Sequence, residues 1–205
     1  MSIQRQGWQF RMATALSLLG MLSGCFLADD DSANPIIPDG SLVQPLASGD
    51  AKLCDNGTEP GEDCDRARID VLDNGLSRIV TWANDGDDGS VQESSEDYRL
   101  RLLKGPGVPA DTYLAQKEHS DDRQRFLGLL MRRDGGGWLR ESPQCDDLVT
   151  DSFIKFVTEG WIRTRDDDSL EGITCFIRRD GLTDTRIYEI LSTASSDTGK
   201  VLFEG

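Results

Sequence analysis

Short apolar segments, each bounded by turn residues, recur from residue 76 to the end of the chain and constrain the fold more than any other feature. Residues 98–102 alternate strictly, so Tyr98, Leu100 and Leu102 would face one side of a sheet. Residues 76–82 follow an Asn74-Gly75 turn signal and are rich in β-branched and aromatic side chains. Further strands are expected at 126–131, 138–139, 161–165, 173–177, 186–191 and 201–203.

This pattern predicts a mainly β fold, in which an antiparallel sheet forms a small barrel or a sandwich, with an α+β fold as the alternative. One helix is expected over 148–157. Val149, Phe153, Phe156 and Val157 fit helical spacing, although Ile154 interrupts the face. An aspartate at 146 or 147 would cap this helix. Residues 51–205 are therefore expected to form a single β-rich domain.

Residues 1–24 have the features of an export signal. They include the basic residues Arg5 and Arg11 and no acidic residue, and an apolar run extends from Met12 to Leu22. A membrane-spanning helix needs about twenty apolar residues, and this run is shorter. The segment therefore predicts a secretory signal peptide that is removed from the mature protein.

The sequence Leu22-Ser23-Gly24-Cys25 follows this run and resembles the lipobox of bacterial lipoproteins. The resemblance implies a diacylglyceryl group on the Cys25 sulfur, cleavage before Cys25, and acylation of the new amino terminus by a fatty acid such as palmitate. Two or more acyl chains hold a protein stably at a membrane. Phe26 follows the cysteine, where aspartate favours inner-membrane retention in enterobacterial lipoproteins, so the resemblance implies the outer membrane, facing the periplasm. The alternative is an ordinary signal peptide followed by a chance cysteine.

Residues 25–50 have the composition of a flexible tether after the lipidated cysteine. They contain three consecutive aspartates and the prolines Pro35, Pro38 and Pro45. A flexible coil of this length would hold the domain about 25–30 Å from the lipid. Two apolar pairs, at 36–37 and 42–43, could dock on the domain.

Four cysteines follow Cys25, and an even number in an exported protein indicates disulfides. We favour Cys54–Cys64, because the residues between them are turn formers, and therefore Cys145–Cys175. The two other pairings stay possible.

The chain is strongly acidic, which limits its partners. It has 22 basic and 37 acidic residues and a net charge of −15, which becomes −17 when Arg5 and Arg11 are removed. Such a surface repels nucleic acid and anionic lipid headgroups, so the membrane contact is expected through the lipid anchor. The charge provides solubility or favours the basic face of another envelope protein.

Two acidic loops, 84–97 and 165–171, are the expected contact surface for such a partner. Asp85, Asp87 and Asp88 would carry the negative charge of the first loop. Trp82 or Trp161 would lie near the bases of these loops.

The sequence contains no convincing catalytic or metal-binding motif. His119 is the only histidine, so paired histidine ligands are excluded. Residues 84–95 resemble a calcium loop but lack the third ligand and the bidentate glutamate. Ser152 and Lys155 match the S-x-x-K pattern without its companion motifs. We therefore expect no catalytic residue, no metal, and no cofactor other than the lipid on Cys25.

The leading hypothesis is a membrane-anchored envelope lipoprotein with a non-enzymatic binding or structural role. The alternative is a small-ligand-binding barrel in the manner of the lipocalins, which the alternating strands and several tryptophans permit. A hydrolase with paired carboxylates is the least favoured hypothesis, because the many acidic residues make such pairs uninformative.

Overall fold

The structure is a computed structural model that describes residues 26–28, 36–58, 64–85, 90–118, 126–165, 173–178, 181–194 and 199–205. The predicted signal peptide and Cys25 lie outside these ranges. No helix in the described ranges is long and apolar enough to cross a membrane.

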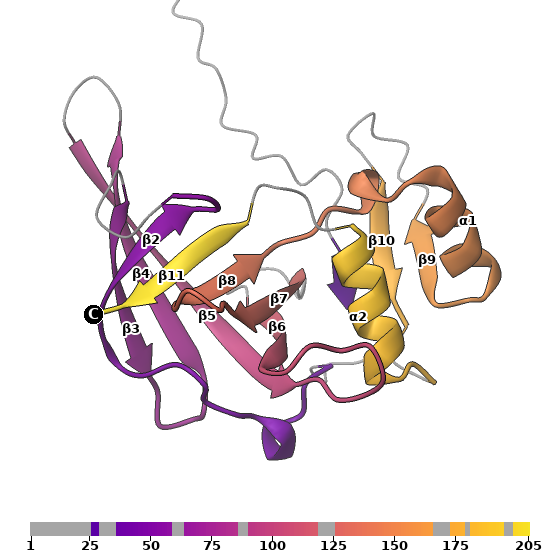
Figure 1. Cartoon of the computed structure of the whole chain (residues 1–205), viewed down its shortest axis with the longest axis horizontal. Helices are drawn as coiled ribbons and strands as arrows, with labels where there is room; N and C mark the ends of the chain where they lie inside the picture. The colour runs from indigo at the N-terminus through magenta and orange to yellow at the C-terminus, as the bar shows by residue number, and fades with distance from the viewer. Residues whose placement is uncertain are drawn as a thin grey trace, which may run out of the picture.

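Eight strands form a closed antiparallel barrel (Figure 1). They are β2 (Gly49–Asp55), β3 (Asp65–Val71), β4 (Ser77–Asp85), β5 (Ser90–Leu102), β6 (Thr112–Glu118), β7 (Phe126–Arg132), β8 (Trp138–Glu141) and β11 (Lys200–Glu204). Their order is β6-β5-β4-β3-β2-β11-β8-β7, and the pairing of β6 with β7 closes the circle. The mainly β prediction is confirmed, and the barrel is the form that the fold takes.

Three more strands and two helices lie beside the barrel (Figure 1). The short strand β1 (Phe26–Ala28) forms one antiparallel pair with β7 and runs parallel to β10 (Thr174–Ile177). β9 (Ile162–Arg165) pairs with β10 at the outer edge of this extension. The helices are α1 (Thr150–Thr158) and α2 (Asp184–Thr193), and two 3-10 turns are η1 (Asp39–Ser41) and η3 (Cys145–Asp147).

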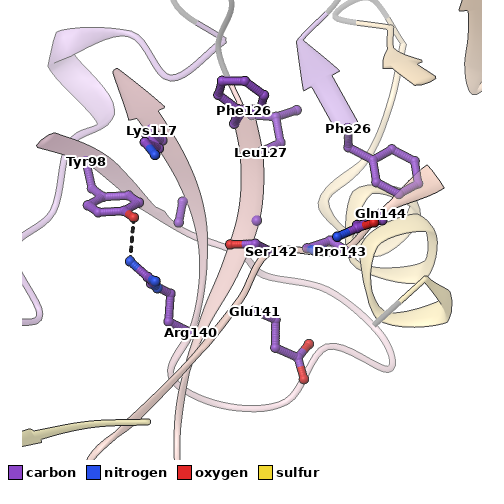
Figure 2. Close-up of a pocket in the computed structure, with 12 residues that line it drawn as sticks. Phe26, Tyr98, Lys117, Phe126, Leu127, Arg140, Glu141, Ser142, Pro143 and Gln144 are labelled. Carbon is purple, nitrogen blue, oxygen red and sulfur yellow. Dashed lines mark hydrogen bonds between the residues drawn. The ribbon is translucent and has the colours of Figure 1, made fainter. Parts of the chain in front are cut away.

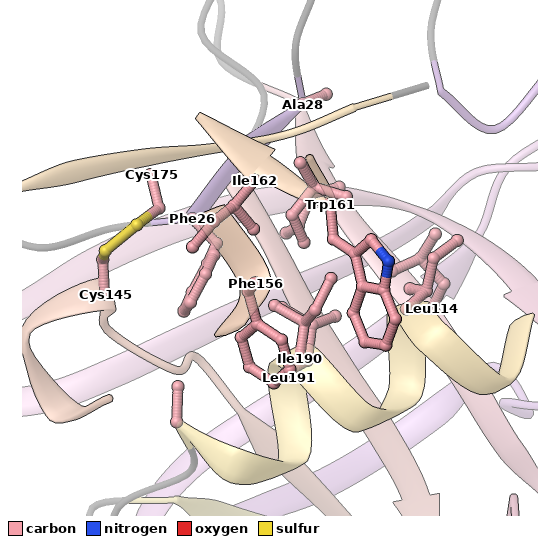
Figure 3. Packing of buried hydrophobic residues seen from close by; sticks show 14 of the residues in the cluster. Phe26, Ala28, Leu114, Cys145, Phe156, Trp161, Ile162, Cys175, Ile190 and Leu191 are labelled. Atoms are coloured by element: carbon pink, nitrogen blue, oxygen red, sulfur yellow. A yellow bond between two sulfur atoms is a disulfide. The ribbon is translucent and has the colours of Figure 1, made fainter. Parts of the chain in front are cut away.

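The molecule has two apolar cores, one inside the barrel and one outside its wall. The inner core contains Leu53, Ile69, Leu100, Leu130 and Leu202, which point inward from five different strands. The outer core fills the space between β6–β7, the two helices and the β1–β10–β9 extension (Figure 3). Alternate residues of β6 and β7 serve different cores, because successive side chains of a strand point to opposite faces.

The region 186–191, predicted as a strand, is instead part of helix α2. The side chain of Thr183 accepts a hydrogen bond from the Arg186 amide at the helix N-terminus. Ile187, Ile190 and Leu191 are buried together at helical spacing, which a strand would place on opposite faces. The prediction was wrong because the capping threonine and this spacing were overlooked.

The other elements agree more closely with the sequence. The predicted helix over 148–157 corresponds to α1, and the seven other predicted strands correspond to β4, β5, β7, β8, β9, β10 and β11. The strands β1, β2, β3 and β6 were not predicted. The expected acidic loop 84–97 is largely a hairpin, because β4 extends to Asp85 and β5 begins at Ser90.

The segment expected to be a tether packs on the domain in its described parts. Phe26 is fully buried in β1, and Ile37 and Leu46 are also buried, in the outer and the inner core. The Gln116 side chain accepts a hydrogen bond from the Ile36 amide at 3.1 Å. Val43 donates its amide to Leu100 at 2.9 Å. The apolar pairs thus dock as expected, and their burial outweighs the proline-rich composition that indicated a flexible chain.

Both predicted disulfides are present. Cys54 and Cys64 join across 4.4 Å between their Cα atoms. Cys145 and Cys175 join across 5.7 Å and connect η3 to β10 (Figure 3).

Candidate functional site

A pocket of about 270 Å³ opens beside β7, where β7 stops pairing with β8 and begins to pair with β1 (Figure 2). Its lining comes from β5, β6, β7, β8, β1 and the segment after β8. The lining residues are Phe26, Tyr98, Ala115, Lys117, Phe126, Leu127, Gly128, Arg140, Glu141, Ser142, Pro143 and Gln144.

The opening arises because β7 changes its neighbour along one edge. β8 pairs with β7 as far as Leu129 opposite Glu141 and then leaves the sheet. β1 takes over at Phe126, which lies opposite Leu27. Gly128 lies between these two pairings, and a Cβ there would stand 2.3 Å from the Glu141 carbonyl oxygen. A glycine is therefore required where the departing strand crosses β7.

Three lining residues of this pocket, Tyr98, Lys117 and Arg140, form a hydrogen-bonded cluster with Glu96, which lies behind them. Glu96 accepts hydrogen bonds from Tyr98 and Lys117, and from Arg140 at 2.7 Å. Arg140 also donates to the Tyr98 hydroxyl at 2.8 Å (Figure 2). The strand register explains the cluster, because Tyr98 lies opposite Lys117 and Glu96 is two residues away on the same face. These four residues are called the ionic cluster below.

Glu96 and Arg140 keep their charges at neutral pH. Burial acts to raise the pKa of Glu96, but the positive charge of Arg140 and the hydrogen bonds from Lys117 and Tyr98 outweigh burial and lower it to about 2. Burial raises the pKa of Tyr98, so its hydroxyl stays a neutral donor to Glu96. Burial acts to lower the pKa of Arg140, but Tyr98 and Glu96 raise it overall. The cluster contains two cations and one carboxylate, and the Glu141 carboxylate, which also lines the pocket, balances the remaining positive charge.

Arg140 has one donor that no described residue pairs with. Its Nε atom is buried and has no hydrogen-bond partner among the residues that the structure describes. Its side chain is only 18% exposed. A buried N–H group without a partner costs about 1–3 kcal/mol, so an acceptor that reached it would be stabilised. Figure 2 shows the Glu141 carboxylate turned away from Arg140 and Lys117.

The remaining wall of the pocket is largely apolar. Phe26, Leu127 and Pro143 line the pocket, and Phe126 lies beside Lys117, whose Nζ is 6.0 Å from the centre of its ring (Figure 2). Apolar side chains next to the two cations Lys117 and Arg140 complement a small molecule that is apolar at one end and anionic at the other. The same arrangement disfavours proton transfer by Glu96, whose low pKa makes it a poor general acid near neutral pH.

The pocket is shallow, because the rest of the barrel interior is filled. Below the ionic cluster, the inner core leaves a residual cavity of about 10 Å³ beside Leu46, Ile79 and Leu130. Trp138 is packed in this core, where its ring lies 5.7 Å from that of Tyr113. Among the described residues, the barrel therefore offers a site at one opening, and Trp138 is packed in the core instead of lining that site.

The binding residues suggested by the sequence are not brought together at this pocket. Trp161 is buried in the outer core and stacks on Phe156, with 5.3 Å between ring centroids (Figure 3). Trp82 is partly exposed on the outside of the barrel and donates to Glu93. Asp85 ends β4. Asp87, Asp88 and loop residues 166–171 lie outside the described ranges, and a basic partner for them stays a prediction.

Sequence reasoning missed the residues of the ionic cluster other than Tyr98, which it placed only in the core. One available signal was the period of two along β5, which puts Glu96 on the same face as Tyr98 and Leu100. A glutamate on a predicted core face requires a buried partner. Lys117 and Arg140 come from strands 21 and 44 residues away along the chain, so no local pattern could have paired them with Glu96.

Comparisons with protein-family models, with curated proteins and with solved structures found no match for this chain.

Proposed function

We propose that the protein is an exported lipoprotein, anchored through a lipid on Cys25, whose barrel binds a small amphipathic anion without transforming it. The observation that carries the binding proposal is the pair of cations, Arg140 and Lys117, in the lining of a pocket that also contains the apolar side chains of Phe26, Phe126 and Pro143. An anionic ligand would pair with these cations and bury its apolar part against Phe26 and Phe126.

The lipobox resemblance at 22–25 and the two disulfides support the export part of the proposal. Disulfides persist in oxidising compartments such as the bacterial periplasm. Phe26 after the cysteine favours attachment to the outer membrane, with the barrel facing the periplasm.

The size of the pocket limits the part of the ligand that it holds. A volume of about 270 Å³ accommodates about nine non-hydrogen atoms, if each takes the roughly 30 Å³ of a water molecule. A six-carbon carboxylate has this size. We therefore propose hexanoate as the probe that fills the pocket.

Binding can be measured with the lipoprotein in nanodiscs, using trifluoromethyl-labelled hexanoate and fluorine NMR, with empty nanodiscs as the blank. Saturable binding is expected, and hexanol should bind at least about tenfold more weakly because it cannot form a charge-assisted bond. The Ser142→Trp variant places a large ring at the exposed rim of the pocket and should abolish binding. The matched control Gln92→Trp, on an exposed position of β5 away from the pocket, should bind normally. Equal affinity of Ser142→Trp and the natural protein would exclude this pocket as the site.

The anchor is tested separately by metabolic labelling with a radioactive fatty acid. The natural protein should be labelled and should sediment with membranes, and Cys25→Ala should lose both properties. Labelling that persisted in Cys25→Ala would contradict the lipoprotein assignment.

A further inference from the structure

We propose that the ligand is a single-chain aliphatic carboxylate taken up directly from the bilayer, because the pocket opens beside the strand that leads from the anchor. This inference rests on the proposed function, both on the lipid at Cys25 and on anion binding in the pocket. It adds the source of the ligand and the route by which the ligand enters.

The first argument is the position of β1 in the fold. Phe26, Leu27 and Ala28 are 0%, 6% and 6% exposed, and they pair with both β7 and β10. Phe26 also lines the pocket. Because one residue extends a chain by at most about 3.6 Å, a lipid on Cys25 would be attached within one residue of the pocket wall. No flexible spacer would separate the pocket from the membrane.

The second argument is a group of exposed apolar side chains in the same part of the molecule. β1 and β10 run in parallel, with Phe26 opposite Cys175, so Ile173 lies at the end of the pair from which β1 starts. Ile173 is 47% exposed, and its amide donates to Asp146 at 3.0 Å. Val149, three residues after Asp146, is 63% exposed. Ile173 and Val149 would contact lipid when the anchor on Cys25 holds the start of β1 against the bilayer.

The remaining exposed apolar residues support this orientation. Among the described residues, the large apolar side chains that are exposed are Val91, Val149, Ile154, Val157 and Ile173. All except Val91 belong to α1, the residue before it, or the residue before β10. The half of the molecule that contains β1 therefore carries four of these five exposed side chains.

The third argument is the order of chemical groups in the pocket. The cations Arg140 and Lys117 lie on the inner wall, and Phe26 and Pro143 belong to the side from which β1 and the segment after β8 enter. A carboxylate that entered head first would reach Arg140 and leave its chain between these apolar side chains. Only the first carbons need to fit the volume of about 270 Å³, and a longer chain could remain in the bilayer.

Aliphatic carboxylates occur both in membranes and free in water, so the test must separate the two sources. A flexible Gly-Ser spacer of about 20 residues, inserted between Cys25 and Phe26, would move the pocket about 25 Å from the bilayer. The anchor and β1 both stay intact in this variant. The same spacer inserted after Gly107, an exposed glycine in the turn between β5 and β6, is the matched control.

Two ligands are measured with each full lipoprotein in nanodiscs. Fluorine-labelled dodecanoate, dissolved in the nanodisc bilayer, reports uptake from the membrane, and labelled hexanoate in the buffer reports the pocket itself. We expect the spacer after Cys25 to slow dodecanoate uptake at least about tenfold, because the chain must then cross water, and to change the hexanoate affinity less than about twofold. The control insertion should change neither.

Each other outcome has a distinct meaning. Equal dodecanoate uptake by the spacer variant and the natural protein, with normal hexanoate binding, would overturn uptake from the membrane and leave the proposed function intact. If neither ligand bound to any form, the proposed function itself would fail. If the lipidated protein bound neither ligand but Cys25→Ala bound hexanoate, the acyl chain of the anchor would fill the pocket, and the inference would be overturned.

Discussion

At the scale of single residues, Glu96 is the centre of the site and of its charge balance. It accepts hydrogen bonds from three side chains, while its own side chain is 27% exposed. Removing its carboxylate would leave Lys117 and Arg140 together at the pocket without an anion. Buried charges that lose their partner are strongly destabilising, so Glu96 serves stability and also holds Arg140 in place.

We predict that Glu96→Gln lowers stability in a pH-dependent manner. The pKa of Glu96 falls from 4.5 to about 2 on folding. Its contribution to the free energy of unfolding is therefore fully present above pH 4.5 and is lost as the pH falls toward 2. The contribution is at most about 3 kcal/mol, from 1.36 kcal/mol per pKa unit. Urea denaturation between pH 2 and 7 should show a smaller acid-induced loss for Glu96→Gln than for the natural protein. The control Glu93→Gln, at an exposed position of the same strand, should lower the free energy of unfolding by less than about 0.5 kcal/mol. A similar loss of stability in both variants would contradict a special role for Glu96.

At the scale of elements, α2 is attached to the barrel by both charge and burial. Asp184 in its first turn accepts from Arg101 at 2.7 Å and from the Lys104 amide at 2.9 Å, both near the end of β5. A carboxylate in the first turn also favours the helix dipole. Ile190 and Leu191 are fully buried in the outer core (Figure 3). The helix is therefore held at its start by ion pairing and along its length by apolar packing.

We predict that Ile190→Ala and Leu191→Ala each destabilise the protein by about 2–5 kcal/mol, because both remove fully buried branched side chains. In a helix, two adjacent residues can both face the core. A strand that covers one side of a core would bury only one of them, because successive side chains point to opposite faces. Chemical denaturation measures both costs, and Thr193→Ala, at an exposed position of the same helix, is the control. A large cost for only one of the two substitutions would favour the strand that the sequence pattern predicted.

At the scale of the whole molecule, the two cores are stabilised by different means. The barrel closes on itself, so strand pairing holds the inner core without help from the extension. The outer core depends on β1, β9, β10 and the helices, which join the barrel wall mainly through side-chain packing. The Cys145–Cys175 disulfide ties the chain that leaves β8 to β10, and it therefore fastens the extension.

We predict that replacing Cys145 and Cys175 together by serine lowers the free energy of unfolding by about 3–4 kcal/mol, from the chain entropy of a loop with a sequence separation of 30. The matched double replacement of Cys54 and Cys64, with a separation of 10, should cost about 1 kcal/mol less. Urea denaturation of the oxidised proteins measures both. If the shorter loop proved the more costly one, loop entropy would not be the main contribution of these bonds.

Much of the fold could be predicted from the sequence because it depends on neighbours along the chain. The alternation at 98–102, the turn at 74–75 and the spacing of the cysteine pairs are local patterns, and the structure agrees with each. The strands that were missed, such as β2 and β3, contain charged residues on their outer face, which weakens the apolar signal. The missed helix α2 did carry a local signal in Thr183 and the spacing of Ile187, Ile190 and Leu191.

Considered by itself, the sequence determined the β class, the cysteine pairing that we favoured and the resemblance to a lipoprotein signal, all from short-range patterns. Only the tertiary structure decided that β11 meets β2 and β8, that Glu96 meets Arg140, and that Phe26 belongs to the wall of a pocket. Glu96 and Arg140 are 44 positions apart in the chain, and the pairing of β11 with β2 places Val201 opposite Cys54. Their partners are selected by the register and closure of the whole sheet, because each strand offers backbone groups that any other strand could pair.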